Sequence, residues 1–288
     1  MDRSAEKLLK DIRKYAKAEA AYERSRLRLV EKEARSLGQT EASVQKELKA
    51  FGVDVKSLLK ETAVEERELQ KVHKRLMALV LPPLFPGDLV LELPRDPNVF
   101  DVKPPAIDGF GRRGFSDADC GFNLPLGETN LFVSRKGSGW GIQATAGQPG
   151  VSTLVFQFTP PRAGNVLVDV FVDLKGQFSL SAHDHWYTST RADIDLKVSS
   201  RLFQHYWEFG PSSVIINEHR TDSSNAARID RMERLSYSSS FSANDTVLFF
   251  VEVELNVNAH SSHARADVDF KTGAERRIKV PLIRVRYF

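Results

Sequence analysis

All 13 prolines of this 288-residue chain lie after residue 80. The first 80 residues contain only two glycines, Gly38 and Gly52, so they can form long helices, because proline and glycine are the strongest helix breakers. This stretch has 19 Lys and Arg residues against 14 Asp and Glu, a net charge of +5. Residues 81–288 contain 17 of the 18 phenylalanines and carry a net charge of −2. The contrast predicts a helical module at 1–80 followed by a β-rich module.

Apolar residues of the helical module recur at steps of three and four, which is typical of a narrow helix seam. Gly38, followed by Thr40, predicts a short turn between two long helices. We therefore expect an antiparallel helical hairpin or coiled coil that serves oligomerisation or docking, with self-association through the helices favoured. The seam residues are Val44, Leu48, Phe51, Val55, Leu58, Leu69, Val72, Leu76 and Leu79.

Two details of the helical module are less regular. The first segment carries a weaker stripe that repeats every seven residues, made of Leu8, Tyr15, Tyr22 and Leu29. In the second segment, Asp54 could cap a new helix after Gly52 and split the segment in two. Because the seam continues in phase across Gly52, the pattern favours one helix with a kink.

The rest of the chain predicts strands. Residues 81–127 hold eight prolines and several glycines, which indicates an irregular connector with one strand candidate at 89–93. From residue 128 to 288, alternation with period two predicts an antiparallel β-sandwich, jelly-roll-like, so the expected fold class is α+β. The stretch 236–242 stays open between strand and loop. The other expected strands are 129–135, 140–145, 152–158, 166–174, 177–183, 193–198, 212–219, 247–257, 263–270 and 277–287.

Composition excludes several classes of protein. A net charge of +3 excludes a globally basic nucleic-acid wrapper, and interleaved charges in the helices indicate a solvated face, so we expect no nucleic-acid partner. The lone Cys120 excludes an internal disulfide. The charged N-terminus has no apolar stretch of a signal peptide, and the longest uncharged stretch, 76–87, is broken by prolines. We expect no transmembrane segment and a protein that is cytoplasmic or released without a signal peptide.

His183 and His185 form the clearest candidate metal site. Residues two apart on a strand face the same side, so both imidazoles could bind one divalent metal ion. With Gly176 upstream, the segment resembles the cupin metal motif, which implies a metal-dependent jelly-roll enzyme. The segment departs from that motif because the next acidic residues, Asp193 and Asp195, are not glutamates placed shortly after the pair. Surface loop histidines are the alternative interpretation.

Other motifs favour ordinary structural roles. Gly109, Gly111 and Gly114 match G-x-G-x-x-G, but without a helical period after them they predict a flexible loop, where Arg112 and Arg113 are available to an anion.

Two further groups of polar residues also have plain interpretations. Glu252 and Glu254 alternate along a predicted strand, which is typical of a polar face rather than a catalytic pair. His260 and His263 lie in a predicted turn and are interpreted as solvated. We assign no catalytic residue and no cofactor.

Four aromatic residues, Trp186, Tyr187, Tyr206 and Trp207, are the candidate ligand-binding residues. Exposed aromatics on a sandwich stack on sugars or anchor protein partners. The segment 156–166 resembles a strand-turn-strand of carbohydrate-binding sandwiches, which implies a glycan ligand.

We therefore expect a non-catalytic interaction or structural protein, whose helices assemble and whose sandwich binds a protein or glycan. Such an architecture is similar to that of toxins, phage-type appendages and receptor-binding proteins. The alternative is the metal-dependent enzyme that uses His183 and His185.

Overall fold

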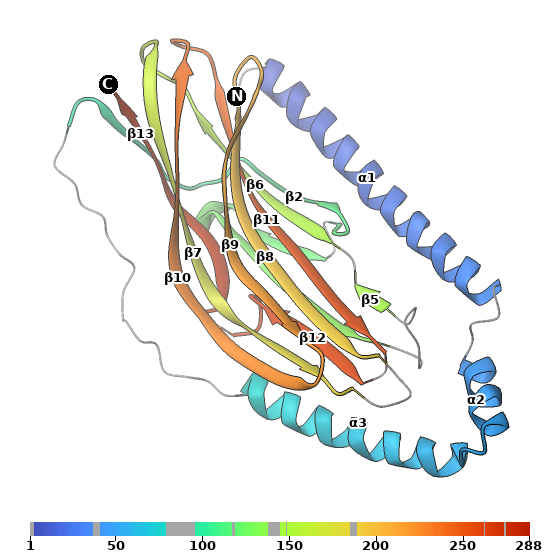
Figure 1. Cartoon of the computed structure of the whole chain (residues 1–288). Coiled ribbons are helices and arrows are strands. Elements are labelled where there is room, and N and C mark those ends of the chain that lie inside the picture. The colour runs from blue at the N-terminus through green and yellow to red at the C-terminus, as the bar shows by residue number, and fades with distance from the viewer. Residues whose placement is uncertain are drawn as a thin grey trace.

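The computed structural model of the chain describes residues 3–36, 41–78, 96–116, 119–137, 145–147, 149–184, 189–261, 263–273 and 275–288. In these residues three helices precede an antiparallel β-sandwich whose strands form two sheets (Figure 1). The prediction of an antiparallel sandwich preceded by helices is confirmed, whereas the jelly-roll connectivity stays a prediction. None of the described helices is long and apolar enough to cross a membrane.

Within the described part of the chain, the first sheet has seven strands and the second has six. In spatial order the first sheet contains β1 (Val99–Val102), β13 (Arg277–Tyr287), β4 (Glu128–Lys136), β12 (Ala264–Asp269), β7 (Gly164–Ala182) and β10 (Ser223–Phe241), with β3 (Cys120–Asn123) beside β4. The second contains β2 (Asp108–Arg113), β6 (Gly150–Phe158), β11 (Val247–His260), β8 (Arg191–Phe203) and β9 (Trp207–Arg220), with β5 (Thr145–Gly147) beside β11. A short 3-10 helix, Leu124–Leu126, precedes β4.

The core lies between the two sheets, as the period-two pattern predicts. Alternate residues of β7 and β11 face inward and are at most 2% exposed, because successive side chains of a strand point to opposite faces. These inward residues are Val166, Val168, Val170, Val172 and Leu174 on β7, and Val247, Phe249, Val251, Val253 and Leu255 on β11.

An acidic residue on the outward face of β7 joins three strands. Asp169 is 1% exposed, and its carboxylate accepts hydrogen bonds from Ser236 Oγ (2.5 Å) and Arg234 Nε (3.0 Å) of β10 and from Arg286 of β13. Burial alone would raise the pKa of Asp169, but these hydrogen bonds lower it below its ordinary value. The carboxylate is therefore held in its charged form.

Several strands were not predicted from the sequence. β1, β2 and β3 lie within the range 81–127, and β10 includes residues 236–241 of the open stretch and the residues before it. The interpretation of the G-x-G-x-x-G segment as a flexible loop was wrong, since β2 pairs with β6 throughout. A Cβ on Gly109 would lie 2.6 Å from the Phe122 ring, and one on Gly111 would lie 2.8 Å from the Ser116 backbone. These glycines therefore permit close packing. The expected strand 89–93 and most of 140–145 lie outside the described residues.

The helices are α1 (Arg3–Ser36), α2 (Glu41–Ala50) and α3 (Val55–Ala78). The prediction of one kinked helix across Gly52 was wrong. Gly52 has a φ of +81°, in the left-handed region that favours glycine, and Asp54 Oδ1 accepts a hydrogen bond from the backbone N–H of Lys56 at 3.0 Å. Asp54 thus caps α3 at a new helix start. The predicted turn at Gly38 and Thr40 lies outside the described residues.

The predicted hairpin is not confirmed, because the helices contact the sandwich. α1 runs along β2 on the outer side of the second sheet, and α3 contacts β7 near the opposite end of the sandwich from the first turns of α1 (Figure 1). Among the seam residues, Val55 is 3% exposed and Phe51 is 84% exposed, so the seam is not one continuous buried face. Val44, Leu48 and Leu58 are half-buried, and Leu79 and the side chains of Leu69, Val72 and Leu76 lie outside what the structure describes.

Candidate functional site

The first half of α1 packs on an apolar patch of the second sheet. The helix contributes residues that are at most 6% exposed and recur at helical spacing: Ala5, Leu9, Ala16 and Ala20. The sheet contributes outward-facing residues, among them Phe110, Val155, Leu248 and Phe250. Small alanine side chains allow the helix backbone to approach the sheet closely, and burial of the patch favours docking of α1 on its own chain.

Ion pairs surround this patch. Arg13 of α1 contacts Asp108 at 2.9 Å and donates a hydrogen bond to the Gly109 carbonyl at 2.8 Å. Farther along the helix, Glu19 lies 3.7 Å from Arg113. These contacts fix the direction of α1 along β2, since each joins a different turn of the helix to that strand.

The carboxylates that the sequence placed on strand faces are engaged by arginines. Glu252 is 6% exposed and contacts Arg112 at 2.8 Å and Arg201 at 2.7 Å. Glu254 contacts Arg113 at 3.2 Å. Burial lowers the pKa of Arg201, although Glu252 opposes that shift. We expected Arg112 and Arg113 to be available to an anion, but in the structure both already have carboxylate partners.

Two further carboxylates, those of Asp193 and Asp195 on β8, show a similar arrangement. Asp193 Oδ1 lies 2.6 Å from His219 Nδ1 and 2.8 Å from Arg191 Nε. Asp195 lies 3.3 Å from the Lys197 ammonium group. Both carboxylates thus have cationic or imidazole partners on the sheet, as expected for a polar strand face.

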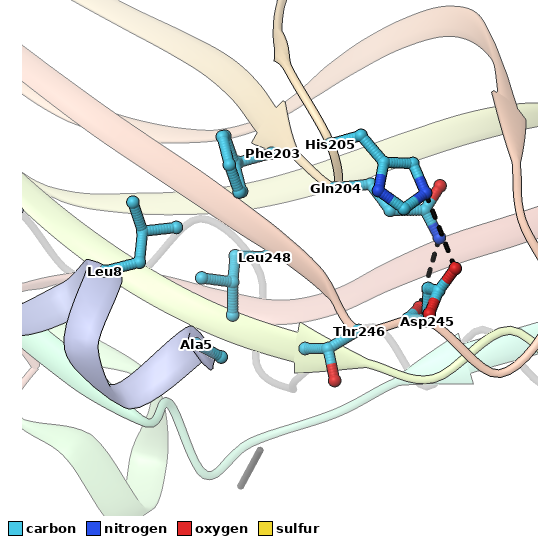
Figure 2. A pocket seen from close by; sticks show the side chains of 8 residues that line it. All are labelled: Ala5, Leu8, Phe203, Gln204, His205, Asp245, Thr246 and Leu248. Atoms are coloured by element: carbon cyan, nitrogen blue, oxygen red, sulfur yellow. Dashed lines mark hydrogen bonds and ion pairs between the residues drawn. The ribbon is translucent and has the colours of Figure 1, made fainter. Parts of the chain in front are cut away.

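A pocket of about 440 Å³ lies between the first turns of α1 and the turn that joins β8 to β9 (Figure 2). Its size is within the usual range of small-molecule sites. One side is apolar, and the other carries an amide, an imidazole, a carboxylate and a hydroxyl group (Figure 2). The lining residues are Ala5, Leu8, Phe203, Gln204, His205, Asp245, Thr246 and Leu248.

Hydrogen bonds between the β8–β9 turn and residues 242–245 keep the polar side of the pocket in place. The Gln204 side chain donates to the carbonyls of Ser242 and Asp245, both at 3.1 Å, and accepts from the Ser242 N–H at 3.0 Å. His205 Nε2 lies 3.4 Å from Asp245 Oδ2, and the two side chains are about half exposed, at 55% and 56%. Gln204 therefore fixes the turn, and His205 with Asp245 forms an accessible polar pair at the pocket.

Two of the four candidate ligand-binding aromatics adjoin this pocket. Tyr206 follows His205 in the turn and is 61% exposed. A hydrogen bond with Glu208 raises the pKa of the Tyr206 hydroxyl. Trp207 packs on Phe250 with ring centroids 4.9 Å apart, and the Arg201 guanidinium lies 4.5 Å from the Trp207 ring centroid, so Trp207 belongs to the α1 interface. Trp186 and Tyr187 lie outside the described residues.

The candidate metal-binding residue His183 lies near the other end of β8. His183 is exposed and contacts Asp222 at 3.6 Å, while His185 lies outside the described residues. The interpretation of His263 as solvated was wrong, since it is 1% exposed; its carbonyl accepts a hydrogen bond from the His183 N–H, which closes this end of the sandwich. His260 is half-buried. In the part of the chain that the structure describes, no group of three or more His, Cys, Asp or Glu residues could hold a metal ion.

Sequence reasoning missed the polar residues of the pocket. Gln204 and His205 lie between the predicted strands 193–198 and 212–219, and Asp245 and Thr246 precede the predicted strand 247–257, so each pair looks like an ordinary polar turn. The pairing of Leu248 with Phe203 in the sheet brings the two turns together. The one sequence feature that points to this pocket is Tyr206, a candidate ligand-binding aromatic that directly follows Gln204 and His205.

The sequence matches no protein-family model and no curated protein. Among solved structures, an isomalto-dextranase of Arthrobacter globiformis T6, complexed with panose, is 11% identical with a TM-score of 0.26, over 67% of this chain and 24% of that one. CBM35 from Cellvibrio japonicus Abf62 is 7% identical with a TM-score of 0.19, over 65% of this chain and 91% of that one. A family 35 carbohydrate-binding module from Clostridium thermocellum is 10% identical with a TM-score of 0.15, over 65% and 97%. The chain spans about a quarter of the isomalto-dextranase. At these scores the similarities carry no argument about function.

Proposed function

We propose that the protein is a non-catalytic carbohydrate-binding protein whose site is the pocket between α1 and the β8–β9 turn. The observation that carries this proposal is the division of the pocket into an apolar side and a polar side. A sugar ring has an apolar face of C–H groups and an edge of hydroxyl groups, so it needs both kinds of surface. Small-molecule sites in general combine an apolar lining with a few well-placed polar groups.

The polar side offers hydrogen bonds of both kinds to hydroxyl groups. The Asp245 carboxylate accepts, the His205 imidazole can donate or accept, and the Thr246 hydroxyl does both. The exposed Tyr206 ring at the same turn provides a face for stacking. The hydrogen bonds of Gln204 to the backbone of Ser242 and Asp245 hold the two turns together, so binding requires little ordering of their backbone.

In this proposal α1 is a wall of the site. Ala5 and Leu8 line the pocket, and Leu9 and Ala16 hold the same helix on the sheet. The predicted role of the helices in self-association is therefore not part of the proposed function. A jelly-roll connectivity of the sandwich remains compatible with it.

A saccharide array followed by calorimetry tests the proposal with the full-length protein. We expect a saccharide from the array to bind, and His205→Ala and Tyr206→Ala each to weaken its binding at least tenfold. His183→Ala is the matched control, because that histidine is similarly exposed at 49% but lies near the other end of β8. The proposal fails if no saccharide binds or if both pocket variants bind normally. Loss of binding in His183→Ala alone would instead favour the histidine end of the sandwich.

A further inference from the structure

The helix α1 has a second face that its own sandwich does not cover. Tyr15, Tyr22 and Leu29 are 72%, 67% and 65% exposed, respectively. They recur every seven residues, so they form a row of about 21 Å along one side of the helix, given a rise of 1.5 Å per residue. We call this surface the Tyr15–Leu29 face. Ala16 and Ala20, which are buried against the sheet, lie on another side of the helix.

The exposed charges around the Tyr15–Leu29 face are mainly positive. Between residues 5 and 29 the exposed acidic side chains of α1 are Glu6 and Asp11, and the exposed basic ones outnumber them. Arg24 lies 4.0 Å from Asp119 and Arg26 lies 3.1 Å from Glu23, so these two are partly neutralised. Of the exposed basic residues, Lys7, Lys14, Arg26 and Arg28 lie within about 100° of the row around the helix axis, whereas Lys10, Lys17 and Arg24 project farther from it, and the exposed Asp11 lies in line with the row.

We propose that the Tyr15–Leu29 face docks an acidic amphipathic helix of a partner protein. A seven-residue apolar repeat is the spacing that a second helix matches. Tyrosine is among the residues that contribute most to protein interfaces. The excess of positive charge beside the row is complementary to a partner helix with flanking carboxylates, which would also accelerate association.

The same observations argue against two other occupants. A second copy of this chain would bring two positively charged faces together, and like charges across an interface are destabilising. A membrane surface needs a broad apolar helix face. The row here contains three large side chains, with Ala18, Ala21 and Ser25 as the small exposed residues between them.

Binding of a synthetic peptide to the full-length protein tests this proposal. The probe is a three-heptad peptide with leucine at positions a and d and glutamate at e and g, and the control peptide has lysine at e and g. We expect the acidic peptide to bind more weakly as salt is raised, and the lysine peptide to show no binding. The double variant Tyr15→Ala, Tyr22→Ala should lower the affinity at least tenfold, whereas Phe209→Ala, at an 80% exposed aromatic of β9, should not.

Each other outcome overturns the proposal. No binding of the acidic peptide, or equal binding by the double variant, excludes this face as its docking site. Binding to phosphatidylserine vesicles that the double variant loses, without peptide binding, assigns the face to a membrane. A dimer in sedimentation that Tyr22→Ala dissociates assigns it to a second copy. Because both tyrosines are exposed, unchanged circular dichroism is expected in every variant and shows that the fold is intact.

Discussion

The packing of α1 on its own sandwich can be tested by two leucines of the same helix. Leu9 is 5% exposed within the patch on the second sheet, and Leu29 is 65% exposed on the opposite side. Leu→Ala in a buried site usually costs 2–5 kcal/mol, and we expect about 2–3 kcal/mol for Leu9→Ala, since one side of the site is a helix that can shift. Leu29→Ala should change the free energy of unfolding by less than about 0.5 kcal/mol.

The assay is urea denaturation followed by circular dichroism, with tryptophan fluorescence as a second probe. Trp207 lies in the cluster under α1, so its environment reports on docking of the helix. Both variants replace leucine by alanine in one helix, so differences in helix propensity cancel. Equal effects of the two substitutions, or a larger loss for Leu29→Ala, would refute the docking of α1 through its Leu9 stripe.

Three other substitutions test separate parts of the fold. Glu252→Ala leaves two arginines without their buried partner and should lower the free energy of unfolding by about 3 kcal/mol, measured by urea denaturation. The pKa of Asp169 is lowered in the folded state, so its charged form stabilises the protein above the ordinary pKa of about 3.9, and this contribution is lost as the pH falls through the folded-state pKa. Asp169→Asn should therefore flatten the loss of stability in acid titrations below about pH 4. Asp54→Ala removes the cap of α3 and should destabilise the start of that helix, seen as faster hydrogen exchange at Lys56 and Ser57; unchanged exchange there would exclude the cap.

The sandwich was predictable where one strand face is purely apolar. Val166 to Leu174 and Val247 to Val257 alternate without interruption, and both pack inward as the pattern indicates. β2 was missed because Gly109 and Gly111 are required by close contacts with Phe122 and Ser116, which lie outside the strand and which the alternation of apolar residues does not show.

The orientation of α1 was harder to predict for a related reason. The conspicuous repeat of Tyr15, Tyr22 and Leu29 points to solvent, whereas the docked stripe uses alanines, whose hydrophobic signal is weak. Which stripe is covered depends on the shape of the sheet. The pocket depends in the same way on the pairing of β8 with β11, which places Gln204 and His205 beside Asp245. At this turn the sequence selected Tyr206 and Trp207, as members of a group of aromatic residues.

Hydrogen exchange of the full-length protein, with and without the saccharide selected from the array, is the most direct test of the pocket as the binding site. The site predicts slower exchange in three segments at once: the first turns of α1 around Ala5 and Leu8, the turn at 203–206, and residues 245–248. Protection that is absent from α1, or that is confined to the end of the sandwich around His183, would contradict the assignment of the site.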